Sequence, residues 1–127
     1  MAKTPVSPFC PRYHYAVELI GRRWTGAIVR MLLGEPRRFA ELASAIPDLS
    51  DRMLAERLRE LEQEGIVERT VIPETPVRVE YSLTPMGRAL EASIRALGDW
   101  AEHWLPPDVG QRAHAPAKKS ASARSRR

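Results

Sequence analysis

The sequence predicts a mostly α-helical domain that carries one small β-hairpin. The main observation is an amphipathic helix over residues 51–64, in which Leu54, Leu58 and Leu61 recur at i, i+4 and i+7. A shorter helix with one apolar side precedes it at residues 39–46, and a short turn joins the two. Two strand-like runs follow directly. Two helices joined by a turn and followed by a hairpin are typical of a winged helix-turn-helix.

Both ends of the long helix carry residues that favour starting or stopping a helix. Ser50 stands at the N-cap, where its hydroxyl can accept a free backbone N–H. Asp51 follows in the first turn, where negative charge suits the helix dipole. Gly65 is expected to end the helix, because glycine readily adopts a left-handed conformation. The side opposite the leucines carries Arg52, Glu56, Arg59 and Gln63.

Two further helices are predicted before this motif. The first occupies about residues 11–20, after Cys10, with a proline at its first position. The second begins with Thr25 as its N-cap and runs to about Leu33. It is apolar on almost every side, so it belongs in the middle of the core. Residues 1–9 contain two prolines and are predicted to form a flexible arm.

The predicted wing consists of strands at residues 67–72 and 77–83. The tip between them contains two prolines, which cannot continue the ladder of hydrogen bonds. The second strand alternates apolar and polar residues, as a half-buried strand does.

The last helix is predicted to run without a break from Thr84 and Pro85 to about Trp104. Its apolar residues recur at spacings of four and three, which is a heptad-like seam. Together with the apolar side of the first helix, this seam predicts a homodimer. The alternative is that the seam packs inside the monomer. The predicted dimer residues are Tyr13, Val17, Leu90, Ile94, Leu97, Trp100, Ala101 and Trp104.

The positive charge of the protein lies in its C-terminal segment. The net charge is +4, and residues 108–127 account for +5 because they hold six Lys/Arg and one Asp. Residues 106–127 are predicted to be a disordered basic tail after a folded domain at residues 10–105. The domain itself is nearly neutral, so a DNA-binding face there must come from local clustering of arginine.

Other features of the sequence argue against several classes of protein. The three histidines are scattered, and none has the spacing of a metal site. There is no glycine-rich phosphate loop or nucleophile elbow, so the sequence predicts no cofactor and no enzyme. A single cysteine, the lack of a long apolar run and the lack of a signal-peptide pattern predict a cytoplasmic protein that does not enter a membrane.

Several motifs resemble the HxlR family of bacterial regulators. They cover about residues 10–104 and include Leu19-Ile20-Gly21, Trp24-Thr25, Pro36-Arg37-Arg38-Phe39, Arg57-Leu58, Gly65-Ile66-Val67 and Arg78 to Gly87. The resemblance, which extends to the related MarR-type winged helices, implies a homodimeric transcription factor that binds a palindromic operator in double-stranded DNA. Asp51 departs from the pattern, since many members carry a basic or neutral residue there. This departure leaves the operator sequence undetermined, whereas the expectation that the protein binds DNA is unaffected.

On this interpretation the long helix lies in a major groove, and residues at its start reach base edges. Arg52 suits guanine, and Met53 suits a thymine methyl group. Arg78, beside the wing tip, is placed to enter a minor groove. Arg57 either binds phosphate or pairs with a carboxylate such as Glu41, and each of these arginines could instead be a plain surface residue. The predicted DNA-binding residues are Arg37, Arg38, Ser50, Asp51, Arg52, Met53, Glu56, Arg57 and Arg78.

Cys10 is the candidate sensor of oxidants or electrophiles. A helix N-terminus and the nearby Arg12 both make a thiol more reactive. The resemblance implies the same role, since several HxlR members respond through a cysteine near the N-terminus. The alternative is a small packing residue. With no second cysteine, any disulfide would be intermolecular.

We therefore interpret the protein as a sequence-specific DNA-binding transcriptional regulator, with repression favoured over activation. A small-molecule effector in a dimer-interface pocket lined by Tyr13, Tyr15, Trp100 and Trp104 is compatible with this interpretation. The alternative from another class is a winged-helix module that binds proteins without specific DNA binding. The near-neutral charge of the folded part is its best support.

Overall fold

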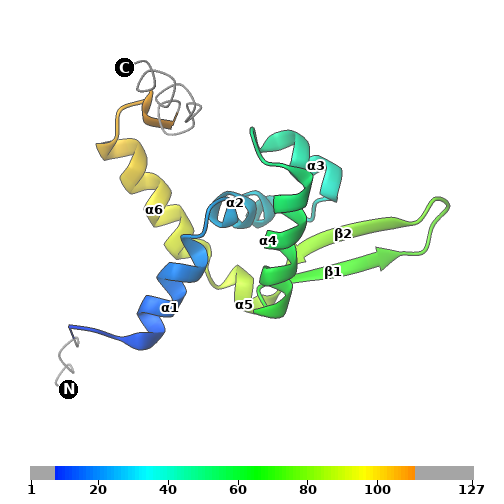
Figure 1. Ribbon diagram of the computed structural model, residues 1–127, viewed down its shortest axis with the longest axis horizontal. Helices are drawn as coiled ribbons and strands as arrows, with labels where there is room; N and C mark the ends of the chain where they lie inside the picture. Colours follow the sequence, from blue (N-terminus) through cyan, green and yellow to red (C-terminus); the bar gives the residue numbers. More distant parts are fainter. Residues whose placement is uncertain (1–7, 111–127) are drawn as a thin grey trace, which may run out of the picture. The chain divides into compact units, whose positions relative to one another are not determined.

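The computed structural model of the chain describes residues 8–110 and has the expected winged helix-turn-helix fold (Figure 1). It divides into two compact units, with the boundary between Glu91 and Ala92. The elements are α1 (Pro11–Ile20), α2 (Thr25–Gly34), α3 (Phe39–Ala45), α4 (Asp51–Gln63), β1 (Val67–Ile72), β2 (Arg78–Leu83), α5 (Pro85–Arg88) and α6 (Glu91–Trp104). The predicted arm and basic tail lie mostly outside the described residues. No helix in the described part has the length and apolar character needed to cross a bilayer.

The core of the first unit is built from aliphatic side chains of α2, α3 and α4. In α2, Ile28 and Val29 are fully buried, as expected for a helix that is apolar on almost every side. The leucine stripe of α4 is also buried, which confirms the predicted inward face. The buried aliphatic residues of these helices are Ile28, Val29, Leu32, Leu33, Leu42, Leu54, Leu58 and Leu61.

The turn and caps around α4 follow the predicted chemistry. The Oγ of Ser50 accepts the backbone N–H of Met53 at 3.1 Å, so Ser50 is the N-cap. Gly65 has φ +82°, the left-handed conformation expected after the helix. Asp48 also has a positive φ, 66°, in the turn between α3 and α4. Aspartate tolerates this conformation better than most residues, which lets a short turn join the two helices.

The wing is an antiparallel hairpin that projects from the helices of the first unit (Figure 1). Val67 pairs with Leu83 at its base and Ile72 pairs with Arg78 towards its tip. A third segment joins at Arg37, whose N–H donates to the carbonyl of Tyr81 at 2.9 Å. Arg37 accepts in return from the Tyr81 N–H at 2.8 Å. The segment between α2 and α3 is therefore fixed to the wing.

The structure differs from two predictions about the helices. The N-cap of α2 is Trp24 and not Thr25, which is buried as the first residue of the helix. Trp24 has φ +79°, and the guanidinium of Arg23 stacks 4.8 Å from the centre of its ring. The predicted last helix is in fact two helices, because the chain turns at residues 89–90 between α5 and α6.

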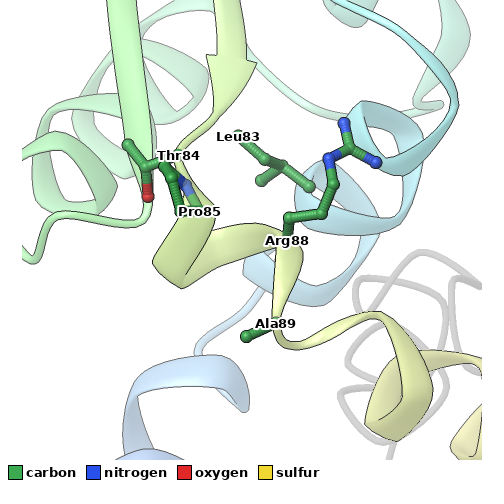
Figure 2. Close-up of a pocket in the computed structure, with 5 residues that line it drawn as sticks. All are labelled: Leu83, Thr84, Pro85, Arg88 and Ala89. Atoms are coloured by element: carbon green, nitrogen blue, oxygen red, sulfur yellow. The ribbon is translucent and has the colours of Figure 1, made fainter.

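The short helix α5 fastens the ends of three elements together. The Oγ1 of Thr84 donates to the carbonyl of Gly65, just after α4. Arg88 donates from Nη1 to the carbonyl of Leu33, at the end of α2, at 3.1 Å. Figure 2 shows Thr84 and Arg88 on opposite sides of this turn, beside a shallow hollow. Between them Gly87 packs directly on Ile66, where a Cβ atom would lie only 2.2 Å from the Ile66 carbonyl oxygen.

Candidate nucleic-acid interface

One face of α4 is free to meet a partner. Arg52, Arg59 and Gln63 are exposed and Glu56 is half-buried on the side opposite the leucine stripe. Within the described part of the chain, neither Arg52 nor Arg59 forms an ion pair. Both guanidinium groups therefore keep the donors that bidentate contacts to guanine or phosphate require.

The residues at the start of α4 that are predicted to contact bases differ in exposure and in free hydrogen-bonding groups. Asp51 and Arg52 are exposed in the first turn. Met53 is half-buried, so only part of its side chain is open to solvent. The hydroxyl of Ser50 already accepts from the Met53 N–H, although its own hydrogen remains able to donate.

The two arginines before α3 have different surroundings. Arg37 belongs to the bridge with Tyr81, and its Nη1 lies 3.5 Å from a carboxylate oxygen of Glu35. Its side chain is only 28% exposed. Arg38 is exposed, and its backbone N–H donates to Oε1 of Glu41 at 2.8 Å, which caps α3. Because the Arg38 guanidinium forms no ion pair within residues 8–110, Arg38 is the better candidate for a phosphate contact.

Arg57 forms structural contacts within the protein, which was one of the two roles considered for it, but its partners differ from the predicted one. Its Nε donates to the carbonyl of Arg23 at 2.9 Å, and its Nη1 lies 3.2 Å from Oε2 of Glu60. The side chain is only 15% exposed. Glu41, the partner considered for Arg57, instead accepts from the Arg38 N–H. Arg57 thus joins α4 to the α1–α2 connection and does not point freely into solvent.

Arg78 on the wing is engaged on two sides. Its Nη2 lies 3.3 Å from Glu74 and its Nε lies 3.5 Å from Glu80. Exposed ion pairs of this kind are weak, typically about 0–1 kcal/mol. A nearby minor groove would therefore have to compete with the two carboxylates for Arg78, but at a modest cost.

Sequence reasoning missed a set of polar contacts between the α1 region and the end of α4. The Tyr15 hydroxyl donates to Oε2 of Glu64, and Arg22 pairs with Glu60 at 3.0 Å. Together with the bond from Arg57 to the Arg23 carbonyl, these contacts form what we call the polar strip, made of Tyr15, Arg22, Arg23, Arg57, Glu60 and Glu64. Tyr15 and Glu64 are 49 residues apart, so no local pattern could reveal the pair.

The Tyr15 hydrogen bond persists through the neutral pH range. Its acceptance by Glu64, and the negative charge of that carboxylate, raise the pKa of the Tyr15 hydroxyl above its ordinary value. A raised pKa means that the contribution of the bond is present below the ordinary tyrosine pKa and is lost only as pH rises through the higher value. The Tyr15 hydroxyl therefore stays protonated at neutral pH and can donate to Glu64.

Cys10 caps the N-terminus of α1. Its Sγ accepts the backbone N–H of Tyr13 at 3.5 Å, and the residue is half-buried and unpaired with another cysteine. Arg12 is exposed two residues later. The thiol is thus partly open to solvent at the place where the dipole of α1 favours negative charge.

The predicted dimer residues are mostly exposed within the protomer. On α1, Tyr13 is 71% and Val17 is 48% exposed. On α6, Leu97, Trp100 and Trp104 are 61%, 53% and 67% exposed. Ile94 does not share this property, because it is buried at 8% exposure, and Leu90 and Ala101 are half-buried. Leu90, Ile94 and Ala101 therefore offer less surface to a partner than the other five predicted residues.

A metal site and a small-molecule pocket were the two other kinds of site considered. Among residues 8–110, no three His, Cys, Asp or Glu side chains are grouped as metal ligands. The hollow in Figure 2 is lined by Leu83, Thr84, Pro85, Arg88 and Ala89. It is shallow, and the polar groups of Thr84 and Arg88 are already engaged with the backbone.

Comparison with known proteins agrees with this geometry. Residues 19–109 match the HxlR-like helix-turn-helix family. The chain belongs to this family. Among its HxlR-like relatives is the HTH-type transcriptional regulator YvaP of Bacillus subtilis, which is 50% identical over 101 residues, covering 80% of this chain and 94% of YvaP. The HTH-type regulator YodB of the same organism is 49% identical over 98 residues, covering 77% of this chain and 88% of YodB.

Solved structures of HxlR-like and related regulators have the same fold. The reduced form of YodB superposes with a TM-score of 0.70 at 48% identity, covering 78% of this chain and 97% of that one. The redox regulator HypR in its oxidised form also gives 0.70, at 38% identity, covering 74% and 96%. The resemblance inferred from the sequence is thus confirmed, and the protein is an HTH-type transcriptional regulator of a family whose matched members are not enzymes.

Proposed function

We propose that the protein is a homodimeric repressor that binds a palindromic operator with α4 and responds to oxidants or electrophiles through Cys10. The observation that carries the DNA-binding part is the exposed face of α4, where Arg52 and Arg59 lack ion-pair partners among the described residues. Its place of action is the compartment that holds the DNA, which is the cytoplasm in a bacterium.

The start of α4 offers the chemistry of base recognition. Arg52 can donate two hydrogen bonds to guanine O6 and N7, and an acidic side chain such as Asp51 can accept from cytosine N4. Both side chains are exposed in the first turn. This supports an operator half-site in which α4 meets at least one G·C pair. Arg38, at the start of α3, is suited to phosphate, which positions the protein without reading sequence.

Alanine substitutions separate the two kinds of contact. Arg52→Ala should cost about 1–3 kcal/mol of operator binding and relax the preference at one base position. Arg38→Ala should weaken binding to all sequences alike and reduce the dependence on salt. Binding would be measured by fluorescence anisotropy with operator variants at several salt concentrations. An Arg52→Ala protein that keeps full sequence discrimination would remove this part of α4 from the reading surface.

The dimer is supported by apolar side chains that a monomer would leave in water. Leu97, Trp100 and Trp104 lie on one side of α6, and each is more than half exposed. Exposed apolar patches of this kind mark protein interfaces. A two-fold dimer would present two α4 helices to half-sites about 34–36 Å apart, which matches the palindrome expected for such regulators.

The sensing role of Cys10 is supported by its capping position and by the relatives. Solved structures include YodB in reduced, diamide-treated and quinone-bound forms, and HypR in reduced and oxidised forms. In this chain diamide would take two electrons from two thiols and join them as a disulfide, which needs a second molecule because Cys10 is the single cysteine. A quinone would instead be attacked at a ring carbon by the thiolate, which forms the C–S bond. The two quinone oxygens then take up one proton from solvent and the proton displaced from that carbon, so the product is a hydroquinone thioether.

Cys10→Ser tests this role directly. Serine preserves an N-cap acceptor for the Tyr13 N–H, so the variant should fold and bind the operator like the wild type. Diamide should weaken operator binding by the wild type, reversibly with dithiothreitol, and leave Cys10→Ser unaffected. Quinone treatment should weaken wild-type binding without such reversal. Equal sensitivity of both proteins in a gel-shift titration would leave Cys10 as a capping residue only.

A further inference from the structure

Packing alone does not fix the direction of α1 within the first unit. Of its ten residues, Leu19 is buried and Ile20 is half-buried, whereas residues 11–18 are all exposed. The remaining attachments are polar. The polar strip joins α1 and the α1–α2 connection to one side of α4 through Arg57, Glu60 and Glu64. The angle between α1 and α4 therefore depends strongly on these polar contacts.

Tyr15 has a special place among them. Arg22 and Arg23 lie in the connection after α1, close to Leu19, whereas Tyr15 lies four residues before Leu19 within the helix. Four residues of helix correspond to about 6 Å along the axis. Two attachment points separated in this way fix the direction of a helix, whereas attachment at one end leaves it free to tilt. The acceptor, Glu64, is the C-cap of α4.

We infer that Tyr15 is a positioning residue for DNA recognition. Through its hydrogen bond with Glu64 it sets the inclination of α4 relative to α1, and it transmits a displacement of the N-terminal end of α1 to the reading helix. The second part rests on the proposed function, in which Cys10 at the N-cap of α1 receives the signal. Tyr15 itself need not touch DNA, because it acts through α4.

A double-mutant cycle on operator binding tests the positioning role. Tyr15→Phe removes the hydroxyl and keeps the ring, and Glu64→Ala removes the acceptor. Each is expected to lower operator affinity by about two- to tenfold, with a smaller change for non-specific DNA. The double variant should bind no worse than the weaker single variant, since both lose the same bond. Glu64→Gln keeps an acceptor oxygen and should lose less than Glu64→Ala.

The matched control is Glu62→Ala, which removes a carboxylate from the same turn of α4. The Glu62 side chain forms no hydrogen bond or ion pair with α1 among the described residues, so this variant should bind the operator like the wild type. Melting temperatures of all variants are measured in parallel. Additive losses in the cycle would overturn the inference. So would equal losses for operator and non-specific DNA that follow a drop in melting temperature.

The transmission is tested with diamide on the same proteins. Tyr15→Phe should show a smaller oxidant-induced loss of operator affinity than the wild type, although Cys10 is present and reacts equally fast. A full oxidant response in Tyr15→Phe, together with none in Cys10→Ser, would show that the signal does not pass through Tyr15. If the wild type does not respond to diamide, oxidant sensing fails as a proposal, and the cycle alone decides the role of Tyr15.

Discussion

Leu97→Glu should convert the protein into a monomer and reduce operator affinity by at least about 100-fold. Leu97 is 61% exposed in the protomer, so the fold of the single chain does not depend on it. Placing a carboxylate in an apolar interface costs several kcal/mol, and about 2.7 kcal/mol already corresponds to 100-fold. A monomer contacts only one half-site of the operator, so it loses most of the binding free energy of the dimer. Sedimentation equilibrium would give the mass, and anisotropy would give the operator affinity.

The matched control is Ala92→Glu, which adds the same charge to a different, exposed side of α6. This variant should stay dimeric and bind DNA normally. Thermal unfolding of both variants shows whether each protomer is intact. A dimeric Leu97→Glu protein with normal stability would mean that the seam of α6 is not the interface, and the alternative of packing within the monomer would gain support.

Gly87→Ala is expected to destabilise the first unit by about 1–3 kcal/mol, even though alanine favours a helix more than glycine. The added Cβ would lie 2.2 Å from the carbonyl oxygen of Ile66 and 3.0 Å from its Cγ2. That carbonyl cannot easily move away, because it accepts from the N–H of Thr84 at 3.0 Å. Urea unfolding followed by circular dichroism measures the change.

Gly26→Ala provides the comparison within another helix of the same unit. Its Cβ would lie 3.7 Å from the carbonyl oxygen of Ile20, which is an ordinary contact. We expect the stability of this variant to be unchanged or slightly raised, by up to about 1 kcal/mol. If Gly87→Ala proved as stable as Gly26→Ala, the turn at α5 would be more adaptable than its contacts indicate.

Local patterns predicted the elements well where the chemistry was local. The leucine stripe of α4, the Ser50 cap and the left-handed Gly65 lie within one helix and its ends, and the structure confirms all three. The alternation predicted for the second strand does not appear in its burial, because residues 78–82 are all half-buried and only Leu83 is buried. In the three confirmed features of α4, the decisive interaction joins residues that are near in sequence or that follow one period.

The errors arose where a distant partner decides the outcome. Thr25 was the predicted cap because threonine is a preferred N-cap residue, but it is buried as the first helical residue and Trp24 holds the cap position. Arg37 looked like a surface arginine beside Arg38, yet its backbone pairs with Tyr81, 44 residues later. The break between α5 and α6 lies beside Gly87, which packs closely on the distant Ile66, and the periodicity of the last helix gave no sign of this contact.

The turn at α5 also determines how the first unit opens. Because Thr84, Gly87 and Arg88 hold the ends of α4 and α2 at once, none of these helices can separate without breaking the attachments of the others. They should therefore unfold together as one cooperative block, at a cost near that of global unfolding. In contrast, α1 is attached by Leu19 and a polar strip at the surface, so it should detach at a much lower cost. If Cys10 is the sensor, as proposed, its modification would displace α1 while the block that contains α4 stays folded.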